Sequence, residues 1–257
     1  MATIAITGAA SGIGAATAER LRQRGDTVIG VDLRGSDVDA DLSTPAGRRR
    51  AADRVTELAG GTLDGLVTSA GLSEPSPTLV AVNFFGTTEL VAALQPALAA
   101  SAQPRVVLLA SSEAIHGGDE QVIEACLAGD EAAARARAEE VMQGELPYIL
   151  YPSSKNAVAR WMRRTCVAPG WADAGIAMNA VGPGIVETPM SAGILADEEM
   201  ARVADEAVPM PLNGHARAED LAAAIGWLVS PENTHMTGQV IFVDGGADAV
   251  RRGELAW

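Results

Sequence analysis

The sequence predicts an α/β fold in which seven parallel strands form one doubly wound sheet with helices on both faces. Short apolar segments rich in β-branched residues alternate with longer alanine-rich segments of helical periodicity, as in repeated βαβ units. The apolar segments lack polar alternation, which is typical of strands that are covered on both sides. No Pro/Ser/Gly-rich linker divides the 257 residues, so we expect a single domain over 1–257.

The pattern places strands near 3–7, 27–32, 37–40, 64–68, 105–111, 176–181 and 239–243, with helices between them. One long interval, between the fifth strand and Tyr151, breaks this alternation and contains an acidic, alanine-rich stretch at 128–143. We therefore expect a helical insertion at about 115–147. Its charged residues suit either a solvated face or an oligomer contact.

Charge and composition narrow the possible partners. The formal net charge of −14 makes nucleic acid and anionic membranes poor partners, because binding them requires positive potential. The chain opens on a strand without a basic leader, and its apolar runs look too short to span a bilayer, so we expect a cytoplasmic protein that binds small molecules. Cys126 and Cys166 are far apart and the histidines are scattered, so no metal site is predicted.

A glycine-rich loop, Thr7–Gly14, directly follows the first strand and precedes an amphipathic helical stretch. Glycines permit a tight turn and a close approach to pyrophosphate, which then sits at the positive end of the following helix. A strand before the loop and a helix after it are the context that a dinucleotide site in a Rossmann fold requires. The predicted cofactor-binding residues here are Gly8, Ser11, Gly12, Ile13 and Gly14.

The second strand ends in Asp32. A carboxylate at this position can accept hydrogen bonds from both adenosine ribose hydroxyls and would repel a 2′-phosphate, so the sequence favours NAD over NADP. Arg34 is the counter-argument, because a basic residue just beyond the strand could pair with that phosphate. Packing against adenine or solvent is the alternative role for Arg34, and the glycine loop itself contains no basic residue.

Lys155 is the only lysine among nineteen basic residues, and it lies four positions after Tyr151. Arginine stays protonated in proteins, whereas lysine is a compact ammonium that can assist the ionisation of a phenol. On a helix the two side chains share a face, so they can form a proton-transfer pair. Pro152 requires the helix to begin close to Tyr151. The other tyrosine, Tyr148, has a proline and not a lysine four positions on.

Taken together, these residues resemble the short-chain dehydrogenase/reductase family over essentially the whole chain. The resemblance rests on TGxxxGIG at Thr7–Gly14, Ser69-Ala70-Gly71, Ser112, the Tyr151/Lys155 pair and Pro183-Gly184. Segments 30–34, 41–44, 82–86 and 244–250 are similar to the bacterial 3α-hydroxysteroid dehydrogenase/carbonyl reductase branch, as is the long insertion. Ser69 stands where the family usually has an asparagine, which removes an amide side chain.

The resemblance implies roles for four catalytic residues. Ser112 and Tyr151 would hydrogen-bond the substrate oxygen, with Tyr151 as general acid or base. Lys155 would bind the nicotinamide ribose and lower the phenol pKa. Asn83 would hold a water that links Lys155 to solvent, or else would serve as a cap or backbone-bonding residue. Ser111 competes with Ser112, since neighbouring residues in a strand face opposite ways, and the family pattern selects Ser112.

The resemblance also implies further cofactor contacts. Asp41 and Leu42 would flank adenine, although their sequence alone suggests an ordinary turn into a helix capped by Ser43 or Thr44. Val186 and Thr188 would contact the nicotinamide carboxamide. The remaining cofactor-binding residues implied by the family are Leu33, Ala70, Gly71, Tyr151, Lys155, Pro183 and Gly184.

Substrate and assembly are less constrained. Segment 187–213, with its methionine, leucine and proline residues, suits a lid over an apolar alcohol or ketone, although packing of a short helix explains the same residues. A steroid, a smaller ketone and an alicyclic alcohol all remain open. Family members commonly pair the helices after the fourth and fifth strands, and the insertion at this surface would replace or block that contact. We expect a homodimer first and a homotetramer second.

The sequence therefore predicts an NAD(H)-dependent oxidoreductase that interconverts a secondary alcohol and a ketone, similar to 3α-hydroxysteroid dehydrogenase. A dehydrogenase of another small or alicyclic secondary alcohol is an alternative on the same site. A dinucleotide-binding regulator without catalysis is a third hypothesis. The intact Ser112, Tyr151 and Lys155 argue against it, because a regulator needs no proton-transfer group.

Overall fold

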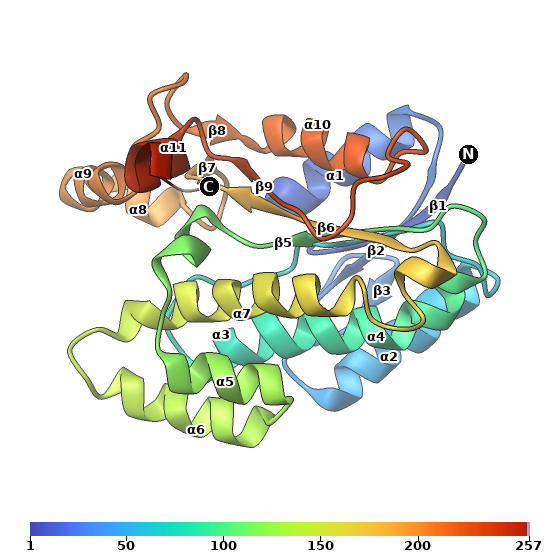
Figure 1. Ribbon diagram of the computed structural model, residues 1–257, viewed down its shortest axis with the longest axis horizontal. Helices are drawn as coiled ribbons and strands as arrows, with labels where there is room; N and C mark the ends of the chain where they lie inside the picture. Colours follow the sequence, from blue (N-terminus) through green and yellow to red (C-terminus); the bar gives the residue numbers. More distant parts are fainter. Residues whose placement is uncertain (256–257) are drawn as a thin grey trace.

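The computed structural model describes residues 1–255 and contains one parallel seven-stranded sheet (Figure 1). The strand order is β3-β2-β1-β4-β5-β6-β9, which confirms the predicted fold class. Because the order reverses direction between β1 and β4, the carboxyl ends of these two strands open a crevice of the kind that binds ligands in such folds. The strands are β1 (Thr3–Thr7), β2 (Thr27–Asp32), β3 (Val38–Asp39), β4 (Gly65–Thr68), β5 (Arg105–Leu109), β6 (Ala177–Pro183) and β9 (Val240–Val243).

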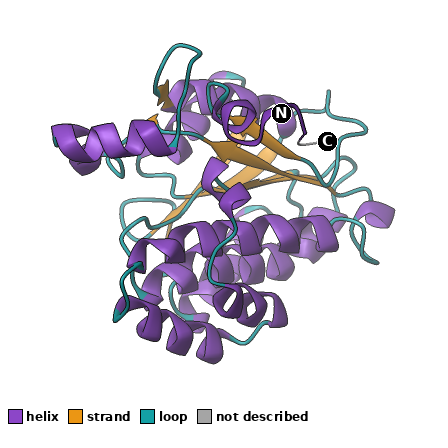
Figure 2. Ribbon diagram, turned by 60° about the vertical axis from the view of Figure 1, so that its left-hand side comes forward, coloured by secondary structure: helices purple, strands orange, loops and turns teal. Residues whose placement is uncertain are grey.

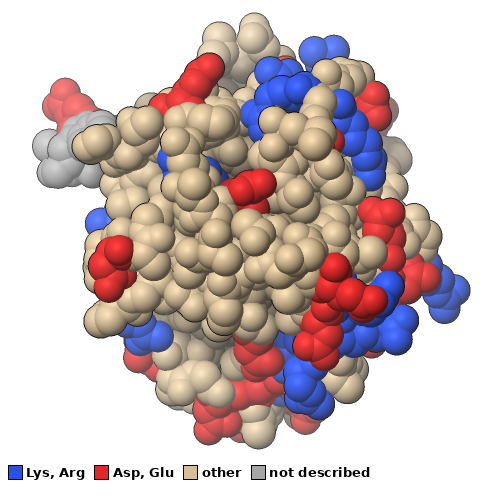
Figure 3. Space-filling view, turned by 90° about the vertical axis from the view of Figure 1, so that its right-hand side faces the viewer, with Lys and Arg blue, Asp and Glu red and all other residues tan. Residues whose placement is uncertain are grey.

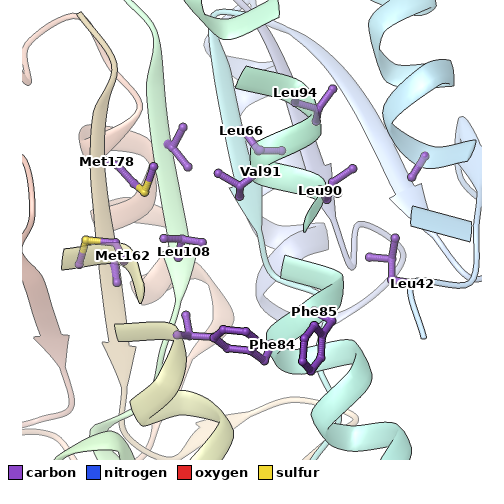
Figure 4. Packing of buried hydrophobic residues seen from close by; sticks show 14 of the residues in the cluster. Leu42, Leu66, Phe84, Phe85, Leu90, Val91, Leu94, Leu108, Met162 and Met178 are labelled. Carbon is purple, nitrogen blue, oxygen red and sulfur yellow. The ribbon is translucent and has the colours of Figure 1, made fainter. Parts of the chain in front are cut away.

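Helices cover both faces of the sheet (Figures 1 and 2). One face carries α1 (Gly12–Gln23) and α10 (Ala218–Leu228), which pack against each other. The opposite face carries α2 (Pro45–Leu58), α4 (Gly86–Ala99) and α7 (Leu150–Thr165). Each face has its own apolar core, and in the larger one Phe84 and Phe85 pack edge to face beside leucines of α4 (Figure 4).

The helical stretch after β4 is long and apolar. Helix α3 (Pro77–Val80), a π-helical turn at Ala81–Phe85 and α4 form one helical stretch, Pro77–Ala99. By length and composition this stretch could cross a bilayer, so the expectation that every apolar run is too short was wrong. Its most apolar window is 67% buried inside the fold, which is the behaviour of a core helix.

The predicted insertion forms two helices, α5 (Glu120–Ala128) and α6 (Glu131–Met142). Helix α5 packs against α7, and α6 packs against α5 and α3 (Figure 1). Arg48 of α2 is only 2% exposed, and its guanidinium binds both Glu89 of α4 and Glu131 of α6. This three-residue ion cluster joins the insertion to the body of the fold, because the buried Arg48 guanidinium pairs with one carboxylate on α4 and one on α6.

The predicted lid region contains two short helices beyond the sheet. Helix α8 (Ala192–Ala196) and helix α9 (Glu198–Ala207) contain no buried residue, and Met200 and Val203 of α9 are exposed. Two bridging strands that the sequence did not predict, β7 (Val186–Glu187) and β8 (Ala216–Arg217), close the base of this region. The last described helix, α11 (Ala247–Arg252), donates hydrogen bonds from Arg251 to the carbonyls of Glu206 and Ala207 at the end of α9.

The face shown in Figure 3 has a broad uncharged area, with acidic and basic side chains gathered toward its edges. Elsewhere arginines and carboxylates pair across elements, as in Arg160 of α7 with Glu120 and Glu124 of α5. Exposed pairs of this kind contribute little to stability individually. They do show that positive side chains in the described part of the chain are often neutralised locally.

The insertion also meets the helix that carries Tyr151 through a close backbone approach. The amide of Asp119 donates to Ser153 Oγ at 2.8 Å, and Ser153 in turn donates to the carbonyl of Ile149. A Cβ atom on Gly118 would lie 2.6 Å from Ser153 Cα, so only glycine fits at this crossing. Gly118 thus permits the hydrogen bond between the two segments.

We predict that Gly118→Ala lowers the free energy of unfolding by about 1–3 kcal/mol, the usual cost of overpacking against backbone that cannot yield. Urea unfolding followed by circular dichroism measures this. Gly144→Ala is the matched control, because the nearest atom to its added Cβ is Val141 O at 3.4 Å. Equal unfolding free energies for the two variants would contradict the prediction.

Candidate active site

Two adjoining cavities lie along the carboxyl edge of the sheet. The smaller, about 430 Å³, runs beside the glycine loop and the end of β2. The larger, about 570 Å³, lies between the end of β5, the start of α7 and the lid region. Ile13, Gly71 and Thr188 line both cavities, so the two are continuous. An extended ligand could therefore reach from Asp32 to Tyr151.

The smaller cavity gathers most of the predicted cofactor residues. Its walls include Gly8, Ser11, Gly12, Ile13, Asp32, Leu33, Asp41, Leu42, Ala70, Gly71 and Thr188. Gly14 lies behind the wall, where an added Cβ would sit 2.1 Å from Gly8 O, so its role is close packing of the loop. Gly8 itself has a φ of +68° and lies against the backbone of Ala70.

The start of α1 suits an anion. Ser11 is the N-cap residue, but its side chain makes no hydrogen bond to the first turn. The N–H groups at the start of a helix have no partner within the helix and carry its positive partial charge, so they remain available to a phosphate. Together with the cavity beside them, these groups fit the pyrophosphate of a dinucleotide.

Asp32 lies at the far end of the smaller cavity. Its Oδ2 accepts a hydrogen bond from Ala10 N at 3.0 Å, and its Oδ1 accepts one from Leu33 N at 2.7 Å. These two bonds fix the carboxylate while leaving lone pairs on both oxygens for ribose hydroxyls. Arg34 is exposed and does not line the cavity, which weakens the case for a 2′-phosphate site.

Helix α7 begins at Leu150, as Pro152 requires, and places Tyr151 and Lys155 on one face beside the end of β5. Lys155 is buried, and its Nζ donates to Leu109 O at 2.9 Å. The same Nζ lies 5.7 Å from the centre of the Tyr151 ring. Burial lowers the pKa of Lys155 to about 8, so the ammonium is still mostly protonated at neutral pH.

Burial has the largest effect on the pKa of the Tyr151 phenol in this structure. Burial raises its pKa above the ordinary value, and the nearby Glu113 carboxylate raises it further, while the interaction with the Ser111 hydroxyl lowers it. The lowering of the phenol pKa by Lys155, which the resemblance implied, stays a prediction. Desolvation of the phenolate outweighs the favourable neighbours.

Ser111 and Ser112 both line the larger cavity, and the interaction with the Ser111 hydroxyl lowers the pKa of Tyr151. The expected contact of Ser112 with the substrate oxygen stays a prediction. Strand β5 ends at Leu109, so strict alternation of side chains no longer applies at these two residues. Ser111 is extended and caps the following 3-10 turn, where its Oγ accepts from Glu113 N at 3.1 Å. The hydroxyl proton of Ser111 is therefore free to point into the site. Ser112 Oγ is buried and has no hydrogen-bond partner among residues 1–255.

Asn83 lies behind the cavity wall and does not line it. Its Oδ1 accepts from Leu72 N at 2.8 Å, and its Nδ2 donates to Leu72 O and to Ser154 Oγ. The side chain thus joins the loop after β4 to α7, which is the backbone-bonding role that the sequence left open. An added Cβ on Gly71 would lie 3.2 Å from Asn83 Oδ1 and 3.6 Å from Lys155 Nζ, so all three groups are close together. The water-holding role of Asn83 stays a prediction.

The larger cavity contains the remaining predicted residues, Pro183, Gly184, Val186 and Thr188, together with Tyr151 and Lys155. Residues of the lid region, including Met190, Ile194 and Val208, complete its apolar wall. Sequence reasoning overlooked Glu113, which lines this cavity together with Ser111 and Ser112. The polar run Ser111-Ser112-Glu113 directly after an apolar strand was the available signal.

Comparison with known proteins agrees with this geometry. Residues 2–123 match the family model described as short chain dehydrogenase, and residues 140–248 match the one described as Enoyl-(Acyl carrier protein) reductase. Over 98% of its length and 98% of the relative's, the chain is 38% identical to a 3-alpha-hydroxysteroid dehydrogenase/carbonyl reductase of Comamonas testosteroni. The chain belongs to the short-chain dehydrogenase family.

Two other family members extend the comparison. A cis-4-hydroxycyclohexanecarboxylate dehydrogenase of Sinomonas cyclohexanicum is 32% identical, covering 95% of this chain and 96% of that one. The crystal structure of a 3-alpha-hydroxysteroid dehydrogenase from Pseudomonas sp. B-0831, complexed with NADH, is 43% identical and superposes with a TM-score of 0.91, covering 98% of this chain and 99% of that one. The predicted family, oxidoreductase class and nicotinamide cofactor are confirmed at this level.

We predict that Ser112→Ala lowers kcat/KM for alcohol oxidation by about 10²–10³-fold, the usual loss when one hydrogen-bond donor to a reacting oxygen is removed. The Ser112 Oγ is buried at the cavity and has no hydrogen-bond partner in the described chain, so it is available to the substrate oxygen. Ser111→Ala is the matched comparison, and initial rates from the absorbance of the reduced cofactor measure both. A larger loss in Ser111→Ala than in Ser112→Ala would contradict the choice of Ser112.

Proposed function

We propose that the protein is an NAD(H)-dependent oxidoreductase that interconverts a secondary alcohol and a ketone. The observation that carries this proposal is the cluster of Tyr151, Ser112 and Lys155 in the larger cavity, which is continuous with the cavity beside the glycine loop. An alcohol in this cavity would meet a phenol, a hydroxyl donor and a buried ammonium together. A non-catalytic regulator would need none of these three groups.

Each side chain has a distinct part in the proton chemistry. The Ser112 hydroxyl, which has no hydrogen-bond partner among residues 1–255, would donate a hydrogen bond to the substrate oxygen. Tyr151 removes the hydroxyl proton in oxidation and returns it in reduction. Lys155, held by Leu109 O, provides positive charge that favours the phenolate when the proton moves. Bound nicotinamide supplies the hydride transfer itself.

The cofactor proposed is NAD. The Asp32 carboxylate is fixed by two backbone amides at the end of the smaller cavity, where adenosine ribose hydroxyls would donate to it. A 2′-phosphate would meet the same negative charge without a basic residue in the cavity wall. Asp41 and Leu42, which line the same cavity, would flank adenine.

The substrate class proposed is an alicyclic secondary alcohol or its ketone. The larger cavity is walled mainly by apolar side chains, among them Leu72, Ile149, Ile185 and Ile194. Two relatives carry names that describe hydroxyl groups on saturated rings, a hydroxysteroid and a hydroxycyclohexanecarboxylate. The apolar wall and these names support a ring substrate. A 3α-hydroxysteroid is the first candidate, and a smaller ring alcohol is the second.

We predict that Tyr151→Phe lowers kcat by at least about 10²-fold, since the general acid/base is removed while the ring and its packing remain. Binding of NAD, followed by quenching of tryptophan fluorescence, should stay close to wild type. Tyr148→Phe is the matched control, because Tyr148 is 68% exposed and has no lysine one turn on. Turnover that survives in Tyr151→Phe would exclude this phenol as the acid/base.

We also predict that Asp32→Asn lowers the ratio of kcat/KM for NAD to that for NADP by about 10-fold or more, because a charged acceptor of two ribose hydroxyls is lost and a 2′-phosphate is no longer repelled. Arg34→Ala is the control and should leave the ratio near the wild-type value. A ratio that changes in Arg34→Ala and not in Asp32→Asn would assign cofactor choice to Arg34.

For assembly and location, we propose a cytoplasmic homodimer, with a homotetramer as the alternative. Helices α5 and α6 occupy the side of α7 that family members commonly use for pairing, which supports an interface different from the usual one. Light scattering after size-exclusion chromatography distinguishes the two assemblies, with a mass near twice the 26.4 kDa of one chain expected. Fractionation of cells that produce the protein tests the location.

A further inference from the structure

Helix α9 supplies part of the wall of the larger cavity, although none of its residues is buried. Ala204, Ala207 and Val208, at its carboxyl end, line the cavity. Met200 and Val203, earlier in the helix, are exposed. Because a segment with few buried apolar contacts opens easily, this wall needs other interactions to keep its position.

Arg251 of α11, which lies beside α9 in Figure 1, supplies such an interaction. Its Nε donates to Ala207 O at 3.0 Å, and its Nη2 donates to Glu206 O. The last carbonyls of a helix have no partner within the helix and carry its negative partial charge, so a guanidinium is attracted to them and satisfies them. Ala207 therefore lines the cavity while its carbonyl is bound by Arg251.

Helix α11 is itself fixed to the sheet where it begins. Asp244, the residue after β9, is only 5% exposed. Its carboxylate accepts hydrogen bonds from Gly246 N at 3.0 Å and from Asp248 N at 2.7 Å. A carboxylate at the start of a helix stabilises it by satisfying free N–H groups and by facing its positive end. Arg251 thus reaches α9 from a helix whose first turn is held at the carboxyl edge of the sheet.

The same arginine is close to the turn that carries Ser112. Helix α11 packs against this 3-10 turn, Ser112–His116. Burial raises the pKa of Glu113 in the turn, and the positive charges of His116 and Arg251 lower it. Arg251 is therefore near two parts of the larger cavity, the end of α9 and the turn after β5.

We propose that Arg251 is a positioning residue that sets the lid wall of the substrate cavity by holding the carboxyl end of α9. This inference rests on the proposed function for its effect on catalysis, and it leaves the ring alcohol as the substrate class. Without Arg251 the position of α9 described above is populated less, and the apparent affinity for the substrate falls with that population. Asp205 Oδ1 lies 2.7 Å from His215 Nε2, so the end of α9 keeps a second contact and the loss is partial.

The kinetic test uses androsterone, a 3α-hydroxysteroid, and cyclohexanol, a small ring alcohol, each with NAD. Arg251→Ala should raise the KM of the better substrate by about 3- to 10-fold, because a cation with two hydrogen bonds to a helix end is lost. The kcat should not fall, since no reacting group is removed. Arg251→Lys should recover part of the loss, because the cation is kept.

Arg252→Ala is the matched control. Arg252 lies on the same helix, but its guanidinium binds Asp248 within α11. The KM of this variant should stay close to wild type. A variant that is merely unstable would lose kcat, which separates misfolding from a displaced lid wall.

A second readout does not require turnover. Hydrogen exchange of the backbone amides at 204–208, followed by mass spectrometry on the protein without substrate, should be about 3- to 10-fold faster in Arg251→Ala than in wild type. In Arg252→Ala the exchange should match wild type.

A KM in Arg251→Ala equal to that in Arg252→Ala would overturn the inference and leave the proposed function intact. Equal exchange at 204–208 in the two variants would overturn it as well. If wild type oxidises neither alcohol with NAD and reduces neither ketone with NADH, the proposed function falls. The exchange measurement still decides in that case whether Arg251 holds α9.

Discussion

The hydrogen bond from Lys155 Nζ to Leu109 O is the contact on which the site depends. It joins the only lysine of the chain to the last carbonyl of β5, and so fixes one turn of α7 against the carboxyl edge of the sheet. Tyr151 is one turn away on the same helix, and Ser112 follows three residues after Leu109. One buried ammonium thus sets the distance between the acid/base and the hydroxyl that binds the substrate oxygen.

Features that follow from local chemistry could be predicted from the sequence. The seven strands, the glycine loop before α1 and the placement of Asp32 at the end of β2 all depend on short-range patterns of apolarity and backbone freedom. The pairing of Tyr151 with Lys155 depends only on helix periodicity, and Pro152 correctly marked the start of that helix. Each of these predictions required a single element or two consecutive ones.

Features that depend on how elements meet could not be predicted in this way. The surroundings of Ser111 and Ser112 could not be predicted because side-chain alternation holds only within a strand, and β5 ends before either serine. The pKa of Tyr151 is set mainly by burial, with smaller effects from Ser111 and Glu113, and residue spacing reveals none of these. Asn83 is used in hydrogen bonds to Leu72 and Ser154 across the fold, so its environment became visible only with three elements in place.

The bond between Asp119 and Ser153 has a consequence for how this protein can evolve. Ser153 is two residues from the catalytic phenol, so the beginning of the inserted helical pair is joined to the same turn that carries the chemistry. The far end of the pair, near Gly144, has looser surroundings. Related proteins in which α5 and α6 are longer or shorter should therefore differ near Gly144, where the inserted pair ends. Changes near Gly118, where the pair begins, would shift the Tyr151 phenol unless Gly118 and Ser153 change together.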